Sequence, residues 1–228
     1  ATYIVGIIGL NECLQFMIGK ELHDDDEALK LGLRIISHMY FKVKEEGKKH
    51  NLKFSLEESP AESASRRLAK IDVRNYPEAV DMVKGHMERD EFYYTNSVHL
   101  RPDAPVDMVK RIEVQSMFHG MIESGAIIHA FVGEERPPAS SIMKLVKRTF
   151  ENTQAAQLTI SPEFTICNSC NRVIPRLVDQ CPHCDVSNLY SIKRNATPDR
   201  VNNWDRTKMQ ELVDRHEEKV TASNKSCK

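Results

Sequence analysis

The sequence lacks an excess of charge of either sign and has no long hydrophobic run. Its 228 residues contain 32 basic and 33 acidic side chains, for a formal net charge of −1. This balance provides no basic surface of the kind that binds nucleic acid or anionic membranes. No run of 18 apolar residues occurs, and the apolar opening segment, Tyr3–Leu10, lacks the basic flank and cleavage site of a signal peptide. Neither a membrane protein nor a nucleic-acid-binding protein is predicted.

Cysteine and glycine are also scarce. Four of the six cysteines fall in one short segment, and the other two, Cys13 and Cys227, have no partner by spacing. A disulfide scaffold would scatter its cysteines, so a reducing, cytoplasmic setting is predicted. None of the nine glycines lies after Gly133. The C-terminal part therefore offers no position for chemistry that requires glycine.

Strand and helix signals alternate through residues 1–156. The long helix is the clearest: apolar residues recur every three or four positions from Leu29 to Val43, behind the acidic run Asp24–Glu27, and the pattern ends near Gly47. Buried or extended strands are predicted at Ile4–Ile8, Lys53–Leu56, Phe92–Ser97 and Ala126–Val132. Further helices are predicted from an Asn11 cap to Glu21, over Ser63–Lys70, from Pro105, and from Pro137–Pro138. This alternation indicates an α/β domain.

From Gln157 onward the sequence consists of short segments and contains two cysteine pairs. This change predicts a small separate module over residues 157–192. Cys167 and Cys170 are separated by two residues, as are Cys181 and Cys184, with ten residues between the pairs. Two such turns complete a tetrahedral sulfur cage, which suits Zn²⁺. Because sulfur fills all four positions, the predicted zinc is structural. Residues 193–228 then form a C-terminal loop and a charged helix, roughly Arg206–Lys219.

Two alternatives stay open at the cysteine cluster. His183 lies inside the second pair and is a rival ligand, although a surface position is the simpler interpretation. Redox-active thiol chemistry is the other alternative, but two pairs in register favour a metal.

Five segments, in order, resemble the C-terminal third of the anaerobic (class III) ribonucleotide reductases. Gly9–Glu12 resembles a segment that opens a barrel helix in that family, and Phe54–Glu62, continuing through Arg67 to Asp72, resembles its "SLEATPAE…R…KID" stretch. Tyr93–His99 resembles "YYTNSFH". The cysteine pairs follow, and Asn203–Trp204 with Lys208 resembles a segment near the family's C-terminus.

The resemblance implies a fold and a reaction. The expected fold is the later half of a ten-stranded α/β barrel of the glycyl-radical-enzyme type, followed by a zinc ribbon that positions the radical loop. The expected reaction is reduction of ribonucleoside triphosphates to deoxynucleotides by radical chemistry. In the family, a glycyl radical oxidises a cysteine on a finger loop, and formate often supplies the reducing equivalents. Family members are usually dimers, so a homo-oligomer or hetero-oligomer is expected.

Individual site residues carry over by motif position. Asn11 matches a substrate-binding asparagine, and Tyr94, Thr95 and Asn96 match a substrate-side strand. Glu62 matches an active-site carboxylate, which suits a general base beside the ribose hydroxyls. Structural alternatives stay open, because Asn11 can cap its helix, Glu62 can be a first-turn acid, and Tyr93 and Tyr94 can be core aromatics.

Two departures from the family pattern bear on activity. The radical glycine is expected about a dozen residues after Cys184, where Ala196 or a neighbour stands instead. The finger-loop cysteine is expected ahead of Tyr3, outside this sequence, and Cys13, on a predicted helix, is a poor substitute. Three explanations fit: a fragment or split subunit that needs an N-terminal half or a radical-generating activase, a divergent reductase with another radical source such as cobalamin, or a non-catalytic descendant.

A reading from another class is a zinc-ribbon interaction or nucleic-acid-binding module. Its hairpin offers only Arg172 and Arg176 as basic residues and no aromatic ones, a poor platform for stacking bases.

Overall fold

The chain opens with a parallel strand pair. The structure, a computed structural model, describes residues 1–59, 61–133, 136–194 and 198–200. Strand β1 (Thr2–Gly6) pairs in parallel with β2 (Lys53–Glu57), in the register Tyr3↔Phe54. Parallel neighbours require a long crossover, which is supplied here by helices α1 (Leu10–Ile18) and α2 (Asp26–His50). The predicted strand at Ile4–Ile8 exists but begins earlier and is not buried. Tyr3 and Ile4 are about half exposed, at 49% and 50%, because β1 pairs along one edge only among the described residues.

The two crossover helices begin in different ways. The Asp25 carboxylate accepts a hydrogen bond from the Ala28 amide at 2.9 Å, and this cap starts α2 where the acidic run predicted it. Helix α1 begins instead at Gly9, whose φ of 75° is left-handed. The prediction that Asn11 caps α1 is therefore wrong: Asn11 lies within the first turn, fully buried.

After β2 the chain forms a helical arm. It comprises α3 (Glu62–Asn75), the 3-10 helix η1 (Pro77–Asp81), and a hairpin of β3 (Lys84–His86), the 3-10 turn η2 (Met87–Arg89) and β4 (Glu91–Tyr93). Helix α3 is longer than the predicted Ser63–Lys70. The predicted strand Phe92–Ser97 is shorter, since regular pairing ends at Tyr93 and only Asn96 forms an isolated bridge, to Ile8.

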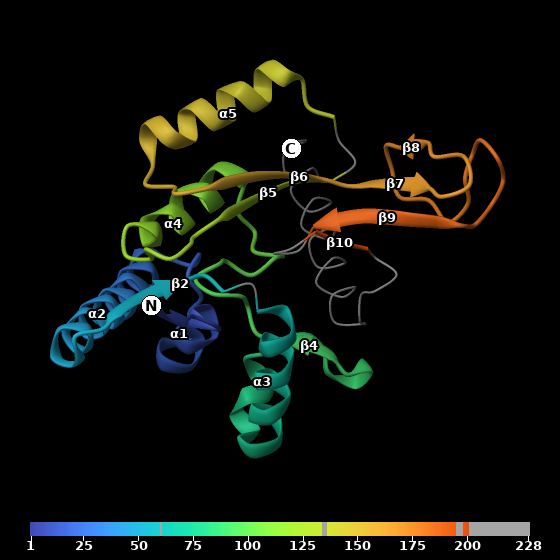
Figure 1. Cartoon of the computed structure of the whole chain (residues 1–228). Coiled ribbons are helices and arrows are strands. Elements are labelled where there is room, and N and C mark those ends of the chain that lie inside the picture. The colour runs from blue at the N-terminus through green and yellow to red at the C-terminus, as the bar shows by residue number, and fades with distance from the viewer. Residues whose placement is uncertain (60, 134–135, 195–197, 201–228) are drawn as a thin grey trace.

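A second parallel unit follows. Helix α4 (Met108–His119) is capped by Asp107, which accepts from the Lys110 amide at 2.8 Å. Strand β5 (Ile128–Gly133) pairs in parallel with β6 (Leu158–Pro162), and α5 (Ala139–Asn152) joins them. Helix α5 runs along this strand pair on the side away from α1 and α3 (Figure 1). Hydrogen bonding thus places Leu158–Pro162 with β5.

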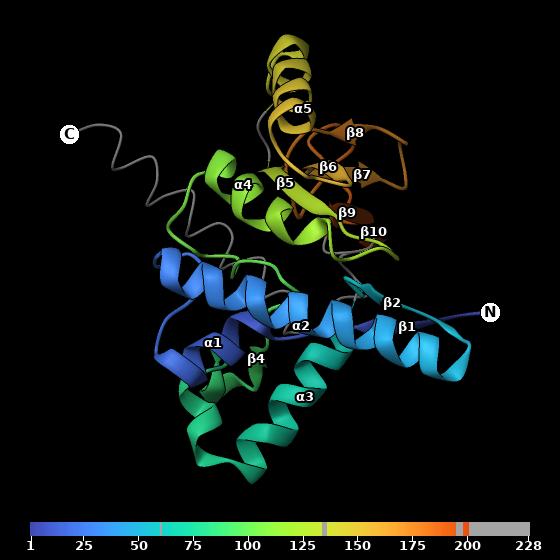
Figure 2. The ribbon, with the colours of Figure 1, turned by 90° about the vertical axis from the view of Figure 1, so that its left-hand side faces the viewer.

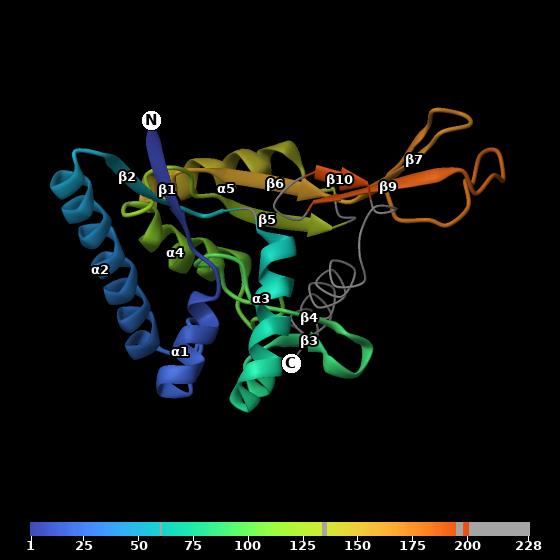
Figure 3. The ribbon, with the colours of Figure 1, turned by 60° about the horizontal axis from the view of Figure 1, so that its bottom comes forward.

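The cysteine module is a four-stranded antiparallel sheet of order β10-β9-β7-β8. Its strands are β7 (Phe164–Cys167), β8 (Val173–Ile174), β9 (Leu189–Arg194) and β10 (Pro198–Arg200). The sheet continues directly from β6 and projects away from the helices (Figure 3). The predicted helix Arg206–Lys219 and the Asn203–Trp204 and Lys208 segment lie outside the described residues.

The main core lies under α2, between the β1–β2 pair and α4 (Figure 2). Its buried members include Leu14, Ile36, Leu56, Val98 and Phe118. Within the described part of the chain, no helix combines the length and apolar character needed to cross a bilayer.

A buried carboxylate joins the two strand pairs. Glu58, just beyond β2, accepts a hydrogen bond from the Ile127 amide at 2.8 Å, and its own amide donates to the Gly125 carbonyl at 2.9 Å. His99 Nε2 lies 3.3 Å from Glu58 Oε2, and His119 Nε2 lies 3.8 Å from Oε1. The Ala156 amide donates to His119 Nδ1 at 2.9 Å, so the proton of a neutral His119 sits on Nε2, facing Glu58.

Burial alone would raise the pKa of Glu58, but the charge and hydrogen bond of His99, with the charge of His119, bring that pKa below its ordinary value. Burial would lower the pKa of His99, whereas Glu58 raises it above its ordinary value. The pair is therefore ionised in the folded protein between the two values.

Replacing Glu58 with glutamine should destabilise the protein in a pH-dependent way. We expect a loss of about 1–3 kcal/mol, because the amide retains an acceptor for Ile127 but removes the charge opposite His99. The loss should be full between the ordinary values of the two groups, 4.5 and 6.5. It should shrink as pH falls through the lowered pKa of Glu58 or rises through the raised pKa of His99. Denaturant unfolding across pH measures it.

The matched control is Glu88→Gln, because Glu88 forms a pair of the same chemistry with His86, at 3.2 Å, on the surface. That substitution should cost less than about 1 kcal/mol. A pH-independent loss in Glu58→Gln would contradict the assigned ion pair.

Candidate metal centre and candidate substrate site

Two copies of one turn present the four cysteines. In the first, the Asn171 amide donates to the Cys167 carbonyl at 2.9 Å and the Cys167 amide donates to Arg172 at 3.0 Å. In the second, Asp185 donates to Cys181 at 2.9 Å, and Cys181 donates to Val186 at 3.0 Å. Asn171 and Asp185 both adopt left-handed φ values, 55° and 58°, which asparagine and aspartate tolerate. Local sequence thus builds each turn.

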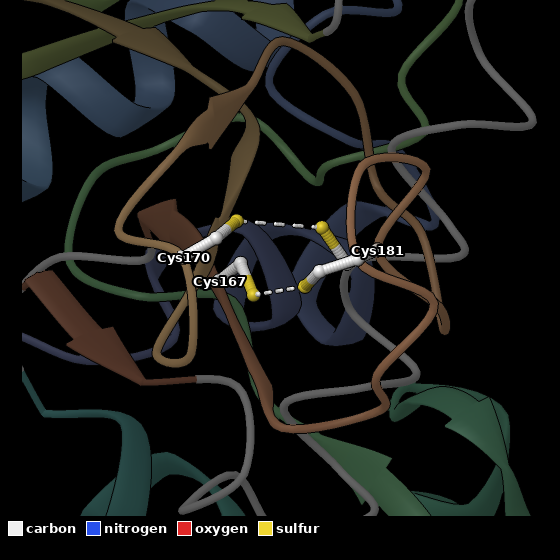
Figure 4. Close-up of side chains that lie close together, drawn as sticks. Cys167, Cys170 and Cys181 are labelled. Carbon is white, nitrogen blue, oxygen red and sulfur yellow. Dashed lines mark hydrogen bonds between the residues drawn. The ribbon is translucent and has the colours of Figure 1, made fainter.

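The turns bring four sulfur atoms together. All four lie within 4.8 Å of one another, with Cys167 and Cys184 at 3.6 Å and Cys170 and Cys181 at 3.7 Å (Figure 4). These separations are far longer than the roughly 2.05 Å of a disulfide bond. Cys167 and Cys181 are buried, whereas Cys170 and Cys184 are partly exposed. This cluster can hold a metal ion.

The sulfurs differ in acidity. The backbone amide of Cys170 lowers the pKa of Cys167 to about 6, while hydrogen bonds with Cys167 and Cys181 raise the pKa of Cys184 to about 12. The Cys167 thiolate therefore forms readily, whereas the Cys184 thiolate does not. A bound cation removes that resistance, so metal binding should release protons.

His183 is not part of the cluster. Its ring is exposed and lies 2.9 Å from an Arg172 guanidinium nitrogen. The prediction that His183 is a surface residue is confirmed by its exposure.

The resemblance motif Gly9–Glu12 lies against residues 95–97 of the motif Tyr93–His99. The Gly9 amide donates to the Thr95 carbonyl at 3.0 Å, and Leu10 donates to Ser97 at 3.3 Å. The Glu12 carboxylate accepts from the Thr95 amide at 3.0 Å and from its hydroxyl at 2.5 Å. Two segments 83 residues apart in the chain thereby form one unit.

Asn11 holds the chain that leaves α1. Its side-chain oxygen accepts from the Leu22 amide at 3.0 Å, and its nitrogen donates to Glu21 at 3.2 Å. Lys84 contacts the other oxygen of Glu21 at 2.8 Å. The buried Asn11 amide therefore has structural partners on both ends.

The other predicted substrate residues are placed differently. The Tyr94 hydroxyl donates to Asp72 on α3 at 2.9 Å. Burial and this hydrogen bond both raise the pKa of Tyr94. Asn96 is partly buried, and its Oδ1 has no partner among the described residues. Glu62 is the first residue of α3, and only its backbone is described.

A pocket of about 520 Å³ lies between α1, α3 and η1, with Tyr94 in its wall. It includes Gly9 and Glu12 but neither Asn11 nor Thr95, which lie behind it. Sequence reasoning assigned no role to Glu12, Asp72 or Glu58. The signal that could have found Glu12 and Glu58 was their position inside the resemblance motifs.

The chain is similar to proteins of known name. A family profile described as "Anaerobic ribonucleoside-triphosphate reductase" matches residues 1–217. The anaerobic ribonucleoside-triphosphate reductase of Enterobacteria phage T4 is 25% identical over 204 residues, covering 84% of this chain and 30% of the relative. The Haemophilus influenzae enzyme of the same name is 25% identical over 130 residues, covering 57% and 18%.

Solved structures agree on the fold. A structure described as an anaerobic ribonucleotide reductase superposes with a TM-score of 0.72 at 17% identity, covering 93% of this chain and 32% of that one. The Thermotoga maritima enzyme in complex with dATP and CTP gives 0.70 at 18% identity, covering 95% and 33%. This chain thus spans about a third or less of its relatives' length. The chain belongs to the anaerobic ribonucleoside-triphosphate reductase family.

Proposed function

We propose that this chain is the C-terminal part of an anaerobic ribonucleotide reductase, which reduces ribonucleoside triphosphates to deoxyribonucleotides by radical chemistry together with an N-terminal partner or segment. The observation that carries the proposal is the hydrogen-bonded contact between Gly9–Glu12 and Tyr94–Ser97. Each motif alone has modest specificity, but their contact in the fold makes the pair a more specific signal than either motif. The free thiols suit a reducing compartment such as the cytoplasm.

The strand arrangement supports the later half of a barrel. Both β1–β2 and β5–β6 are parallel pairs connected by helices. The Ser124 amide donates to Leu56 at 3.0 Å, and Glu58 donates to Gly125, so the end of β2 contacts the approach to β5. Strand β1 is half exposed and has a free edge among the described residues, at which a further strand of a barrel can pair.

The sulfur geometry supports a structural zinc. A tetrahedral site with Zn–S bonds of about 2.3 Å separates its sulfurs by about 3.8 Å. The observed 3.6 and 3.7 Å are close to that value. Four sulfurs leave no position for water, so the zinc would hold the module together and act on no substrate.

We assign substrate-side roles to Asn96 and Tyr94 by their motif position and partial exposure. Glu62 would act as a general base, because loss of the ribose 2′-hydroxyl as water requires proton transfer. Asn11 and Thr95 would act indirectly, because their hydrogen bonds hold in place the segments that carry the substrate-binding side chains. The radical must come from a partner or another source, since Ala196 stands where the family's glycine is expected.

The direct test supplies the chain with the N-terminal half of a relative and measures deoxynucleotide formation without oxygen, beside equilibrium binding of a ribonucleoside triphosphate. Saturable nucleotide binding is expected for the chain or the complex, and turnover only for the complex. Tight, salt-sensitive binding of single-stranded or duplex nucleic acid in a mobility-shift assay, without nucleotide binding, would favour a nucleic-acid-binding module instead.

Two asparagine variants should separate support from substrate contact. Asn11→Ala should lower the free energy of unfolding by about 1–3 kcal/mol, because it leaves the Leu22 amide unpaired. Asn96→Ala should change stability by no more than about 0.5 kcal/mol, since Asn96 Oδ1 has no described partner. Nucleotide affinity should fall about tenfold in Asn96→Ala, or about 1.4 kcal/mol. Unchanged affinity in that variant would remove Asn96 from the substrate site.

Metal analysis tests the zinc proposal. The purified chain should contain about one zinc per chain, and Cys181→Ser should lose it together with the stability of the module. Cys13→Ser is the matched control, because Cys13 is an exposed cysteine outside the cluster. Equal metal content in the two variants would show that the cluster does not bind the ion.

A further inference from the structure

The pocket beside Tyr94 has a chemistry that a nucleotide phosphate does not match. Three carboxylate residues line it, Glu12, Asp72 and Glu78, and no lysine, arginine or histidine does so among the described residues. The charge of Lys84 acts on Glu12, but Lys84 is hydrogen-bonded to Gln15 and Glu21 instead. An anionic ligand would therefore be repelled.

One of these carboxylates, that of Glu12, has an oxygen without a hydrogen-bond partner among the described residues. Glu12 is 5% exposed, and its Oε1 is occupied by Thr95, but its Oε2 is buried without a partner among the described residues. Burial raises the pKa of Glu12. A buried acceptor without a donor is destabilising, so a donor that reaches it from the pocket would recover stability.

The remaining wall and the rim are apolar. Phe16, Leu68, Tyr76 and Met82 line the pocket with Tyr94. Phe16 is 68% exposed and Tyr76 is 60% exposed, and the neighbouring Met17 and Val80 are 56% and 44% exposed. This surface lies on α1 and η1, at the end of the molecule away from the cysteine module (Figure 3). Exposed apolar side chains beside a pocket are typical of a protein-binding surface.

We propose that this pocket receives a lysine or arginine side chain presented by an apolar protein segment, with the cationic group donating to Glu12 Oε2. The aliphatic stem would lie against Phe16 and Tyr76, and the cation would lie among aromatic rings and carboxylates. The exposed rim would contact the apolar residues flanking that side chain. A free metabolite would need the pocket but not the rim, which is why a protein segment is the favoured source.

The proposal does not depend on the reductase activity. It requires only the pocket, its charge and the unpaired oxygen, and it can be tested on the chain alone with zinc supplied.

Fluorescence anisotropy with labelled peptides tests it. The probe is a Leu-Arg-Leu-Leu peptide, and its matched control replaces arginine with citrulline, which keeps the shape and removes the charge. The arginine peptide should bind saturably, and the citrulline peptide at least about tenfold more weakly. Agmatine, a free guanidinium compound, should compete at least about tenfold more weakly than unlabelled arginine peptide.

Protein variants locate the contact. Glu12→Gln retains an acceptor for Thr95 and should weaken the arginine peptide at least about tenfold. Glu78→Gln, at an exposed position in the pocket wall, should weaken it less and leaves the test usable if the first variant fails to fold. Glu88→Gln, outside the pocket, should leave affinity unchanged.

Equal binding of the arginine and citrulline peptides, absence of saturable binding, or unchanged affinity in both pocket variants would overturn the cation site. Agmatine competing as well as the arginine peptide would overturn the protein segment as its source.

Discussion

The fold depends on buried carboxylates that accept backbone hydrogen bonds. Glu12 accepts from Thr95, and Glu58 accepts from Ile127, joining segments 83 and 69 residues apart. Each acid loses hydration on burial, and the amide hydrogen bonds offset part of that cost. Removal of either acid would leave a buried amide unpaired as well as separating two segments. The arrangement of the motifs at the candidate substrate site is therefore a consequence of where these two charges are accommodated.

The cysteine cluster is built on a different principle. Each of its turns is specified within six residues, and the repeated left-handed positions at Asn171 and Asp185 come directly from the local sequence. Longer-range contacts within the module include the pairing of β7 with β9 and the hydrogen bonds between Asn168 and Asn188. A metal would then close the two turns on each other. This explains why the spacing of four cysteines sufficed to predict the cluster, while the substrate side needed the whole fold.

Local signals predicted the helices well, since caps such as Asp25 and the apolar period of α2 depend on neighbours in sequence. They failed where tertiary contacts decide. Asn11 has the residue type of a cap, yet Gly9 begins the helix and Asn11 is used in the core. Glutamate is a residue type usually found on the surface. Only the positions of Thr95, His99 and Ile127 in the fold show that Glu12 and Glu58 are buried. The apolar β1 was expected to be covered, but burial of a strand depends on its sheet neighbours.

Glu12 and Glu58 show how surroundings assign different chemistry to the same side chain. Both are buried and both accept from backbone amides, but the pKa of Glu58 is lowered and that of Glu12 is raised. The difference follows from the charge nearby: His99, whose own pKa is raised, faces Glu58, whereas Lys84 is hydrogen-bonded to Glu21 and only its longer-range charge reaches Glu12. Glu58 thus forms an ion pair with His99 through its Oε2, while its Oε1 has no hydrogen-bond partner among the described residues and lies 3.8 Å from His119 Nε2. Glu12 is also buried, its Oε2 has no hydrogen-bond partner among the described residues, and the residue lines a pocket. A hydrogen-bond donor that enters the pocket would therefore stabilise the Glu12 carboxylate. The same side chain thus connects the buried hydrogen bonds with Thr95 to a surface where a ligand can bind.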